Sequence, residues 1–192
     1  MRISGGSAKG RRTATSKLFA RASKGEALRP TSAKVREALF DILRNRIEGS
    51  AFVDLYAGTG TVGFESLSRG AEKAVFIEPD PDLIEMLRRN ARDFGFSERA
   101  EIIRGRADEF LRKAAASHEQ YDIYFLDPPY QSEEIEKVLP VIGEEELLKT
   151  DGIVVIEHFF KKRLPERAGS LERCKCYRYG DTMLTLYRKV LQ

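Results

Sequence analysis

The sequence YDIYFLDPPY, residues 121–130, decides how the rest of this chain is read. Its first six residues are nearly all apolar or aromatic, which is typical of a strand buried on both faces of a parallel sheet. Pro128 and Pro129 remove two backbone donors and fix two φ angles, so neither a strand nor a helix continues through them. The pattern predicts a stiff turn with the Asp127 carboxylate at its start and the Tyr130 ring at its end.

This turn is expected at the carboxyl end of its strand, which is the edge where open α/β sheets bind ligands. A rigid acceptor beside an aromatic ring suits a planar base that is held by its amino group. An ordinary loop with an aspartate cap is the simpler alternative for the tetrapeptide taken alone.

A glycine-rich turn follows an earlier strand, at residues 51–54. Gly58, Gly60 and Gly63 satisfy the G-x-G-x-x-G spacing and precede a helix expected over residues 61–69. The glycines allow a ligand to approach the backbone closely, and the amino end of the helix offers free N–H groups. This spacing is shared by dinucleotide-binding proteins and methyltransferases, whereas the missing Gly-Lys-Ser/Thr excludes a P-loop.

Two more carboxylates are expected at the same edge of the sheet. Glu78 ends a strand over residues 74–78, where an acid can accept both hydroxyls of a ribose or cap the next helix. Asp108 follows a short strand at 101–104 and is placed to accept from an adenine amino group.

The order of elements predicts an α/β fold with a doubly wound, Rossmann-like, mostly parallel seven-stranded sheet and an antiparallel C-terminal strand. A helix capped by Thr31 with an apolar face that reaches Ile47 comes first. A helix at 132–142, a strand at 153–157 and a hairpin of residues 172–179 and 182–190 close the chain. We expect a basic arm or hairpin at residues 1–28 and one domain at residues 29–192.

The charge is distributed unevenly along the 192 residues. The formal net charge is +3, yet residues 1–30 carry +7, residues 31–160 carry −10 and residues 161–192 carry +6. Basic ends on an acidic body suggest a polyanionic partner, although a solvated terminus is equally simple. Gly5-Gly6 is expected to form the turn of a hairpin over Arg2–Arg12. The basic residues of the arm are expected to contact phosphates: Lys9, Arg11, Arg12, Lys17, Arg21, Lys24 and Arg29.

Other site classes are poorly supported by the sequence. Cys174 and Cys176 are the only cysteines, too few for a disulfide scaffold and without companions for a metal site. His118 and His158 lack companions at triad or metal spacing, so we interpret both as structural or surface residues. No apolar run reaches transmembrane length and no signal peptide is evident, which makes the cytoplasm the expected location.

The turn at Asp127 separates the two enzyme classes that share the glycine turn. Hydride transfer has no evident use for it, whereas methyl transfer to an exocyclic amine does. The Asp127 carboxylate and the Pro128 carbonyl would accept the N–H bonds and hold the nitrogen, and the carboxylate would offset positive charge that develops there. Stacking on Tyr130 would contribute ~1–3 kcal/mol.

On these motifs the chain resembles the bacterial 16S ribosomal RNA guanine-N2-methyltransferase family. The shared features are the Gly5-Gly6 arm, Arg29-Pro30-Thr31, residues 54–65, Glu78 and residues 127–130. The resemblance implies a class I methyltransferase fold and 16S ribosomal RNA, in the small subunit or its assembly intermediate, as the partner. We expect a monomer. It implies S-adenosylmethionine as the cofactor, bound by Thr31, Asp54, Tyr56, Gly58, Thr59, Gly60, Glu78, Asp108 and Asp127, with catalysis at Asp127, Pro128, Pro129 and Tyr130.

Two alternatives stay open. The same type of tetrapeptide serves DNA adenine-N6 and cytosine-N4 methyltransferases, although this chain has no extra domain of a size to read DNA sequence. A non-catalytic RNA-binding protein that retains the fold is the second.

Overall fold

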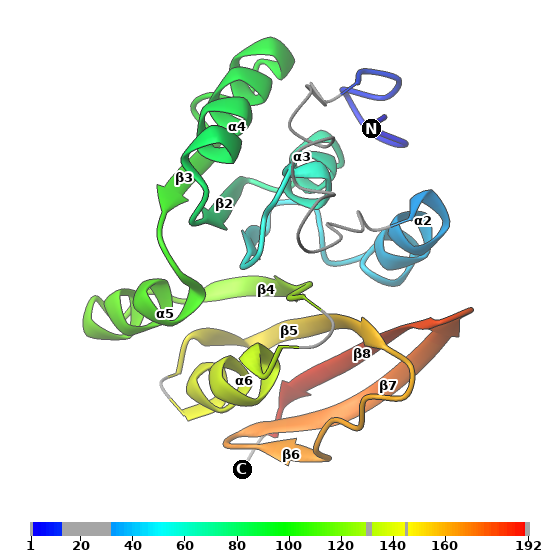
Figure 1. The fold of residues 1–192 in the computed structure, drawn as a ribbon, viewed down its shortest axis with the longest axis vertical. Coiled ribbons are helices and arrows are strands. Elements are labelled where there is room, and N and C mark those ends of the chain that lie inside the picture. Colours follow the sequence, from blue (N-terminus) through cyan, green and yellow to red (C-terminus); the bar gives the residue numbers. More distant parts are fainter. Residues whose placement is uncertain (1, 13–31, 130–131, 145, 191–192) are drawn as a thin grey trace.

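A computed structural model of the protein describes residues 2–12, 32–129, 132–144 and 146–190. These residues form one eight-stranded sheet in the order β3-β2-β1-β4-β5-β8-β7-β6, with helices on both faces (Figure 1). The strands are β1 (Ala51–Asp54), β2 (Lys73–Glu78), β3 (Ala100–Arg104), β4 (Tyr121–Leu126), β5 (Leu148–Phe159), β6 (Arg167–Ala168), β7 (Leu171–Tyr179) and β8 (Thr182–Lys189). The helices are α2 (Ala33–Ile42), α3 (Thr61–Ser68), α4 (Pro81–Phe94), α5 (Ala107–Ala116) and α6 (Glu134–Glu144).

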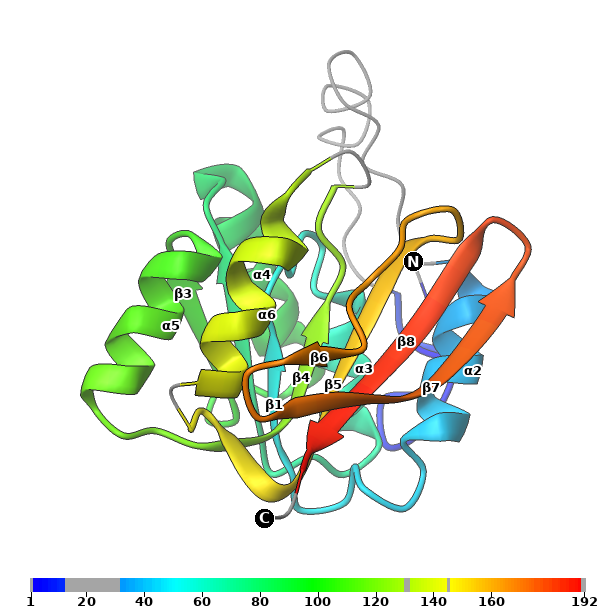
Figure 2. The ribbon, with the colours of Figure 1, turned by 90° about the horizontal axis from the view of Figure 1, so that it is seen from below.

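The predicted α/β architecture is confirmed. Strands β1 to β5 pair in parallel, and β8, β7 and β6 continue the sheet in antiparallel pairs (Figure 2). The sheet has eight strands instead of the seven expected, because Arg167–Ala168 pairs with the start of β7. A strand of two residues carries no alternation of apolar and polar positions, so the sequence pattern could not reveal it.

Alternation along the strands divides the core into two layers. Phe52, Phe76 and Phe125 pack in the layer that holds α2, α3 and α4, whereas Val53, Val75 and Leu126 pack in the layer that holds α5 and α6. Both faces of the central strands are therefore buried, which explains their continuous apolar sequences. None of the helices in the described part of the chain is long and apolar enough to cross a membrane.

The first helix begins one residue later than expected and ends earlier. Its N-cap is Ser32, whose hydroxyl accepts from the backbone N–H of Val35 at 3.2 Å, and not Thr31. The helix ends at Ile42, although Leu43 and Ile47 remain buried beyond it. A turn that follows a helix can keep an apolar face buried, so the apolar pattern placed the residues correctly and misplaced the end of the helix.

The described start of the arm, residues 2–12, packs onto the domain. Ile3 and Ala8 are buried in the core, and Ile3 and Arg11 pair across the loop through a backbone hydrogen bond of 2.9 Å. The expected hairpin of Arg2–Arg12 is present, because Arg2 and Arg12 form an antiparallel bridge. Its turn, however, lies over residues 7–10 and not at Gly5-Gly6. Gly6 has a different role: it has a φ of +74°, and a Cβ there would lie 1.7 Å from the Ser68 carbonyl oxygen at the end of α3.

A buried ionic network ties this loop to the helix that follows the glycine turn. The fully buried Glu65 carboxylate in α3 accepts from Arg36 Nε at 3.1 Å and from Arg69 at 2.9 Å. It also accepts from the Ser4 backbone N–H at 3.0 Å, and Arg36 donates to the Arg2 carbonyl oxygen at 2.9 Å. Glu65 thus connects α2, α3 and the amino-terminal loop at one point.

Glu65→Ala should lower the free energy of unfolding by about 3–5 kcal/mol, because Arg36 stays buried without its carboxylate partner. Glu72→Ala, at an exposed position, is the matched control and should change the stability by less than about 0.5 kcal/mol. Denaturant titration of both variants measures this difference. Equal midpoints for the two variants would show that the network does not hold the fold together.

Candidate functional site

Three adjacent parallel strands bring Tyr56, Glu78 and Asp127 to one level of the sheet. Asp54 of β1 pairs with Phe76 of β2 and with Phe125 of β4, so the three residues lie two positions beyond a matched set. The alignment continues past the strands, because Leu55 N donates to Phe125 O at 3.0 Å and Ala57 N donates to Ile77 O at 2.9 Å. Neighbouring strands are ~4.8 Å apart, so one ligand can span this edge.

The carboxylates at this edge also belong to one face of the sheet. Asp54 and Glu78 follow Phe52 and Phe76 by two residues within their strands, and alternation places them on the side of α3. Asp127 follows Phe125 by two residues directly after β4, and the same alternation, continued by one residue, predicts that side for it. Asp127 is half-buried, Pro128 is buried and Pro129 is exposed. Asp127 therefore lies at the margin of the core, at the edge where the sequence predicted a ligand.

The glycines of the turn have distinct roles. Gly58 has a φ of +52°, and a Cβ added there would meet nothing within 4 Å, so this backbone faces open space. A Cβ at Gly60 would lie 2.3 Å from Leu87, and one at Gly63 would lie 2.3 Å from the Phe76 ring. Gly58 thus leaves room for a ligand, whereas Gly60 and Gly63 allow α3 to pack closely.

Glu78 holds the glycine turn and keeps acceptor capacity to spare. Its Oε2 accepts from the Gly58 N–H at 2.9 Å, and its Oε1 accepts from the Asp80 N–H at 2.9 Å. Burial raises the pKa of this carboxyl, and the two backbone N–H groups oppose that effect. Each carboxylate oxygen can accept a second hydrogen bond, so Glu78 and the open side of Gly58 fit a ribose with two hydroxyls.

Asp54 is buried beneath the glycine turn and bonds the first turn of α3. It is 2% exposed, and its Oδ2 accepts from the Gly63 N–H at 3.1 Å in the first turn of α3. Burial raises the pKa of this carboxyl to about 7, while the Gly63 N–H partly opposes the shift. The position suits shaping of the glycine turn, and the predicted contact with the cofactor remains a prediction.

Tyr56 connects the glycine turn to α6 and to the turn before α5. Its hydroxyl donates to Glu134 Oε2 at 3.3 Å, and Glu134 Oε1 lies 3.8 Å from Arg106.

The expected adenine acceptor Asp108 is half-exposed and pairs with Arg106 at 3.4 Å and Arg112 at 3.2 Å. An adenine amino group would share this carboxylate with two arginines. Thr59, also predicted to bind cofactor, has its hydroxyl 3.0 Å from that of Thr61.

Lys162 holds the chain just beyond the proline turn through a hydrogen bond to Ser132. This residue was not identified from the sequence. Its Nζ donates to the Ser132 carbonyl oxygen at 2.7 Å and lies 3.1 Å from Glu136. Ser132 in turn donates its N–H to the Pro129 carbonyl oxygen at 2.9 Å. The basic run at residues 161–163 was the available signal, but the contact joins two loops far apart in sequence.

The structure describes only part of the predicted RNA-binding and turn residues. Lys9, Arg11 and Arg12 are exposed, and Arg11 donates to the Asp93 carbonyl oxygen at 3.0 Å.

His158 is buried, with Nε2 2.8 Å from Thr185 Oγ1, and burial lowers its pKa. Within the described ranges no group of three or more His, Cys, Asp or Glu could hold a metal ion. Several predicted site residues lie outside the described residues: Lys17, Arg21, Lys24, Arg29, Thr31 and Tyr130.

A sheet with parallel strands in the order β3-β2-β1-β4-β5, continued by an antiparallel β8 and with a glycine turn after β1, is the class I methyltransferase fold. Within that class, the chain belongs to the family described as conserved hypothetical protein 95, whose model matches residues 1–188. This membership agrees with S-adenosylmethionine as the expected cofactor.

Similar proteins carry names of the same kind. A Bacillus subtilis protein described as "Putative rRNA methyltransferase YlbH" is 34% identical over 189 residues, which cover 98% of this chain and 99% of that protein. The ribosomal RNA small subunit methyltransferase D of Haemophilus influenzae is 36% identical over 133 residues, 69% of this chain and 68% of that protein. A solved Escherichia coli structure, "Putative methyltransferase yhhF", has a TM-score of 0.82 at 26% identity and covers 100% of this chain and 99% of its own.

The raised pKa of Asp54 predicts a pH dependence of stability. Between about pH 4, where this carboxyl titrates in the unfolded chain, and about pH 7, where it titrates when folded, only the folded protein holds the proton. The contribution of the Asp54 carboxyl to the free energy of unfolding therefore falls as the pH rises through that interval. Asp54→Asn keeps an acceptor for Gly63 and should remove the loss.

Thermal unfolding at pH 4.5 and pH 7.5 measures this effect. Raising the pH from 4.5 to 7.5 should lower the Tm of the unaltered protein relative to that of Asp54→Asn, because only the unaltered protein loses the contribution of this carboxyl. Asp151→Asn, at an exposed position, should follow the unaltered protein. Parallel curves for Asp54→Asn and the unaltered protein would contradict a buried, protonated Asp54.

Proposed function

We propose that the protein transfers a methyl group from S-adenosylmethionine to the exocyclic N2 amine of a guanine in 16S ribosomal RNA. The observation that carries the proposal is the half-buried Asp127, which lies on the same level and face of the sheet as Glu78 beside the open turn at Gly58. A nucleoside held by Glu78 and a base held by Asp127 would meet above β1, which is the single strand between β2 and β4.

The chain's own residues supply binding and orientation. S-adenosylmethionine, when bound, offers an electrophilic methyl group on a sulfonium. Asp127 and the Pro128 carbonyl accept the amine's N–H bonds and direct its nitrogen, whose lone pair is delocalised into the ring. The carboxylate stabilises the positive charge that develops on nitrogen, and Pro128 and Pro129 fix the geometry, so positioning provides most of the rate enhancement. Tyr130 stacks on the guanine.

The choice of ribosomal RNA rests on the relatives and on charge. The Haemophilus influenzae protein is named for the small ribosomal subunit, and the Bacillus subtilis protein is named for ribosomal RNA. The +7 segment at residues 1–30 favours a phosphate backbone as partner. Lys9 and Arg12 present their side chains to solvent at the start of this segment.

Asp127→Ala should leave binding of S-adenosylmethionine within about threefold and lower methyl transfer by at least ~100-fold, as for loss of a group that stabilises developing charge. Calorimetry measures the first quantity, and tritiated methyl transfer to small subunits from a strain lacking the gene measures the second. Asp151→Ala is the control and should keep normal turnover. Near-normal turnover of Asp127→Ala would place the active site elsewhere.

The same assay separates the alternatives. Nucleoside analysis of the labelled product should give N2-methylguanine from RNA. Methylated adenine or cytosine from a DNA substrate would establish a DNA enzyme, and no transfer to either acid despite measurable RNA binding would establish a non-catalytic protein.

Replacing Lys17, Arg21 and Lys24 together by alanine should reduce the magnitude of the slope of log RNA affinity against log salt concentration by about 2–3. Each phosphate contact contributes ~0.7–0.9 to this slope. These three residues avoid Ile3 and Ala8, whose burial makes deletion of the arm a test of folding instead. Fluorescence anisotropy with a 16S ribosomal RNA transcript at several salt concentrations measures the slope. An unchanged slope would show that these charges serve only solubility.

A further inference from the structure

An aromatic and basic cluster lies where β5 ends against the tip of the β7–β8 hairpin. The guanidinium of Arg178 lies over the Phe160 ring, 3.8 Å from its centroid, and the Phe159 ring lies 5.0 Å from that of Phe160. Lys161 Nζ lies 5.7 Å from the Phe160 centroid and 6.0 Å from that of Phe159. We call Phe159, Phe160, Lys161 and Arg178 the strand-end platform.

The backbone holds this platform firmly at the tip of the hairpin. The Phe160 N–H donates to the Asp181 carbonyl oxygen at 2.9 Å, and Arg178 Nε donates to the Gly180 carbonyl oxygen at 2.9 Å. The rings are half-buried, whereas Lys161 and Arg178 are exposed. A rigid aromatic surface with exposed cations is thus presented to solvent.

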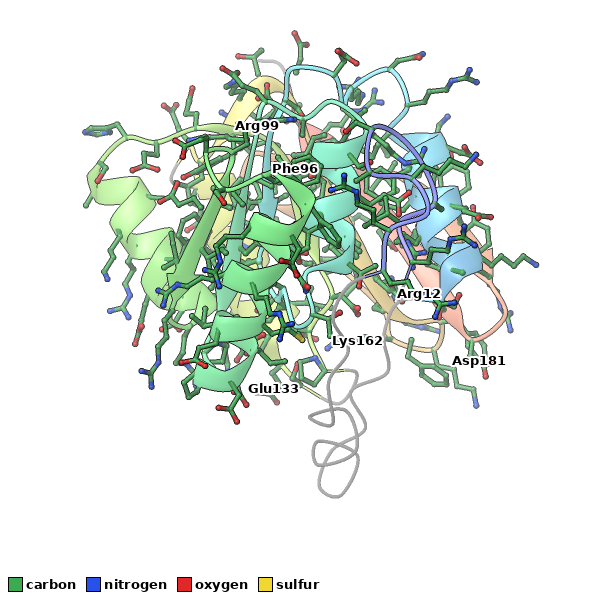
Figure 3. All side chains as sticks on the ribbon, turned by 90° about the horizontal axis from the view of Figure 1, so that it is seen from above. Arg12, Phe96, Arg99, Glu133, Lys162 and Asp181 are labelled. Atoms are coloured by element: carbon green, nitrogen blue, oxygen red, sulfur yellow. The ribbon has the colours of Figure 1, made fainter. Side chains whose placement is uncertain are left out.

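The platform is adjacent to the proposed catalytic turn. Leu126 at the end of β4 pairs with Ile156 of β5, so the proline turn after β4 and the end of β5 at Phe159 lie at the same edge of the sheet. Lys162 also bonds the chain beyond that turn, at Ser132. Figure 3 shows Lys162, Glu133 and Asp181 at one end of the molecule, and Phe96 and Arg99 at the opposite end.

Positive charge here is not neutralised by the nearby acids. Among the described residues, Lys161, Arg163 and Arg178 form no ion pair, whereas Arg167 pairs with Glu172 and Arg173 with Glu166. Asp181 is the acid of the hairpin turn and is exposed, and Glu136 is paired with Lys162. The platform also belongs to the segment that carries +6 over residues 161–192.

We propose that the strand-end platform is a second RNA-binding site, which stacks an unpaired nucleotide that flanks the methylated guanine. Flat aromatic rings and arginine guanidinium planes are the surfaces on which unstacked RNA bases bind, and Lys161 supplies a cation for the adjoining phosphate. The charge favours RNA over a protein partner. This inference rests on the proposed function, because it assumes that the base held at Asp127 belongs to RNA.

Phe160→Leu keeps an apolar side chain against the hairpin and removes the ring. It should raise the Kd for a 16S ribosomal RNA transcript by about 5- to 100-fold, the range for loss of one stacked base. It should also raise KM for RNA while kcat and binding of S-adenosylmethionine remain near normal. Phe160→Trp should restore binding, because it restores a ring.

The salt dependence separates stacking from charge. Lys161→Ala should lower the salt slope of log affinity by about 0.7–0.9, whereas Phe160→Leu should weaken binding at every salt concentration with the slope unchanged. Arg188→Ala removes an exposed charge at the far end of the hairpin, where it pairs with Glu172 in the strand register, and should have little effect on affinity.

Equal RNA affinity of Phe160→Leu and the unaltered protein would overturn the platform while leaving the proposed function intact. So would equal losses in Phe160→Leu and Phe160→Trp, which would indicate a structural role alone. An effect on binding to small subunits without an effect on naked RNA would assign the surface to a protein contact. Failure of the unaltered protein to methylate RNA would instead overturn the proposed function itself.

Discussion

Parallel pairing of β1 with β2 and β4 is the constraint on which the rest of the structure depends. This register fixes Tyr56, Glu78 and Asp127 at one level, although they come from three separate parts of the chain. Because successive side chains alternate between faces, the same register selects which carboxylates share the side of α3. A slip of one residue in either pair would turn Glu78 or Asp127 toward the opposite face.

Carboxylates that look alike in sequence receive different environments from this register. Asp54 is buried against the first turn of α3, and its pKa is raised to about 7. Glu78 bonds two backbone N–H groups and retains acceptor capacity at its edge, whereas Asp108 is exposed between two arginines. Asp127 is half-buried beside two prolines. The differences come from desolvation and from the number of nearby donors.

The amino-terminal loop is joined to the same framework through Glu65. The helix that begins at the glycine turn carries this carboxylate, which bonds Arg36 of α2 and Ser4 of the loop. The start of the basic arm is thus fixed relative to the turn at Gly58. In the proposed function, the arm and the strand-end platform would both contact the RNA whose guanine is held at the catalytic edge.

The sequence by itself determined the order of the elements, the glycine turn and the acids at the ends of β1, β2 and β4, because local apolar runs and prolines report strands and turns directly. It misplaced the first N-cap, missed the two-residue β6 and placed the turn of the amino-terminal hairpin at Gly5-Gly6 instead of residues 7–10. Only the tertiary structure decided that Glu65 anchors the loop, that Lys162 braces the proline turn and that Arg178 covers Phe160. Those contacts join residues far apart in the chain, and nothing in local periodicity records which side chains the folded sheet brings together.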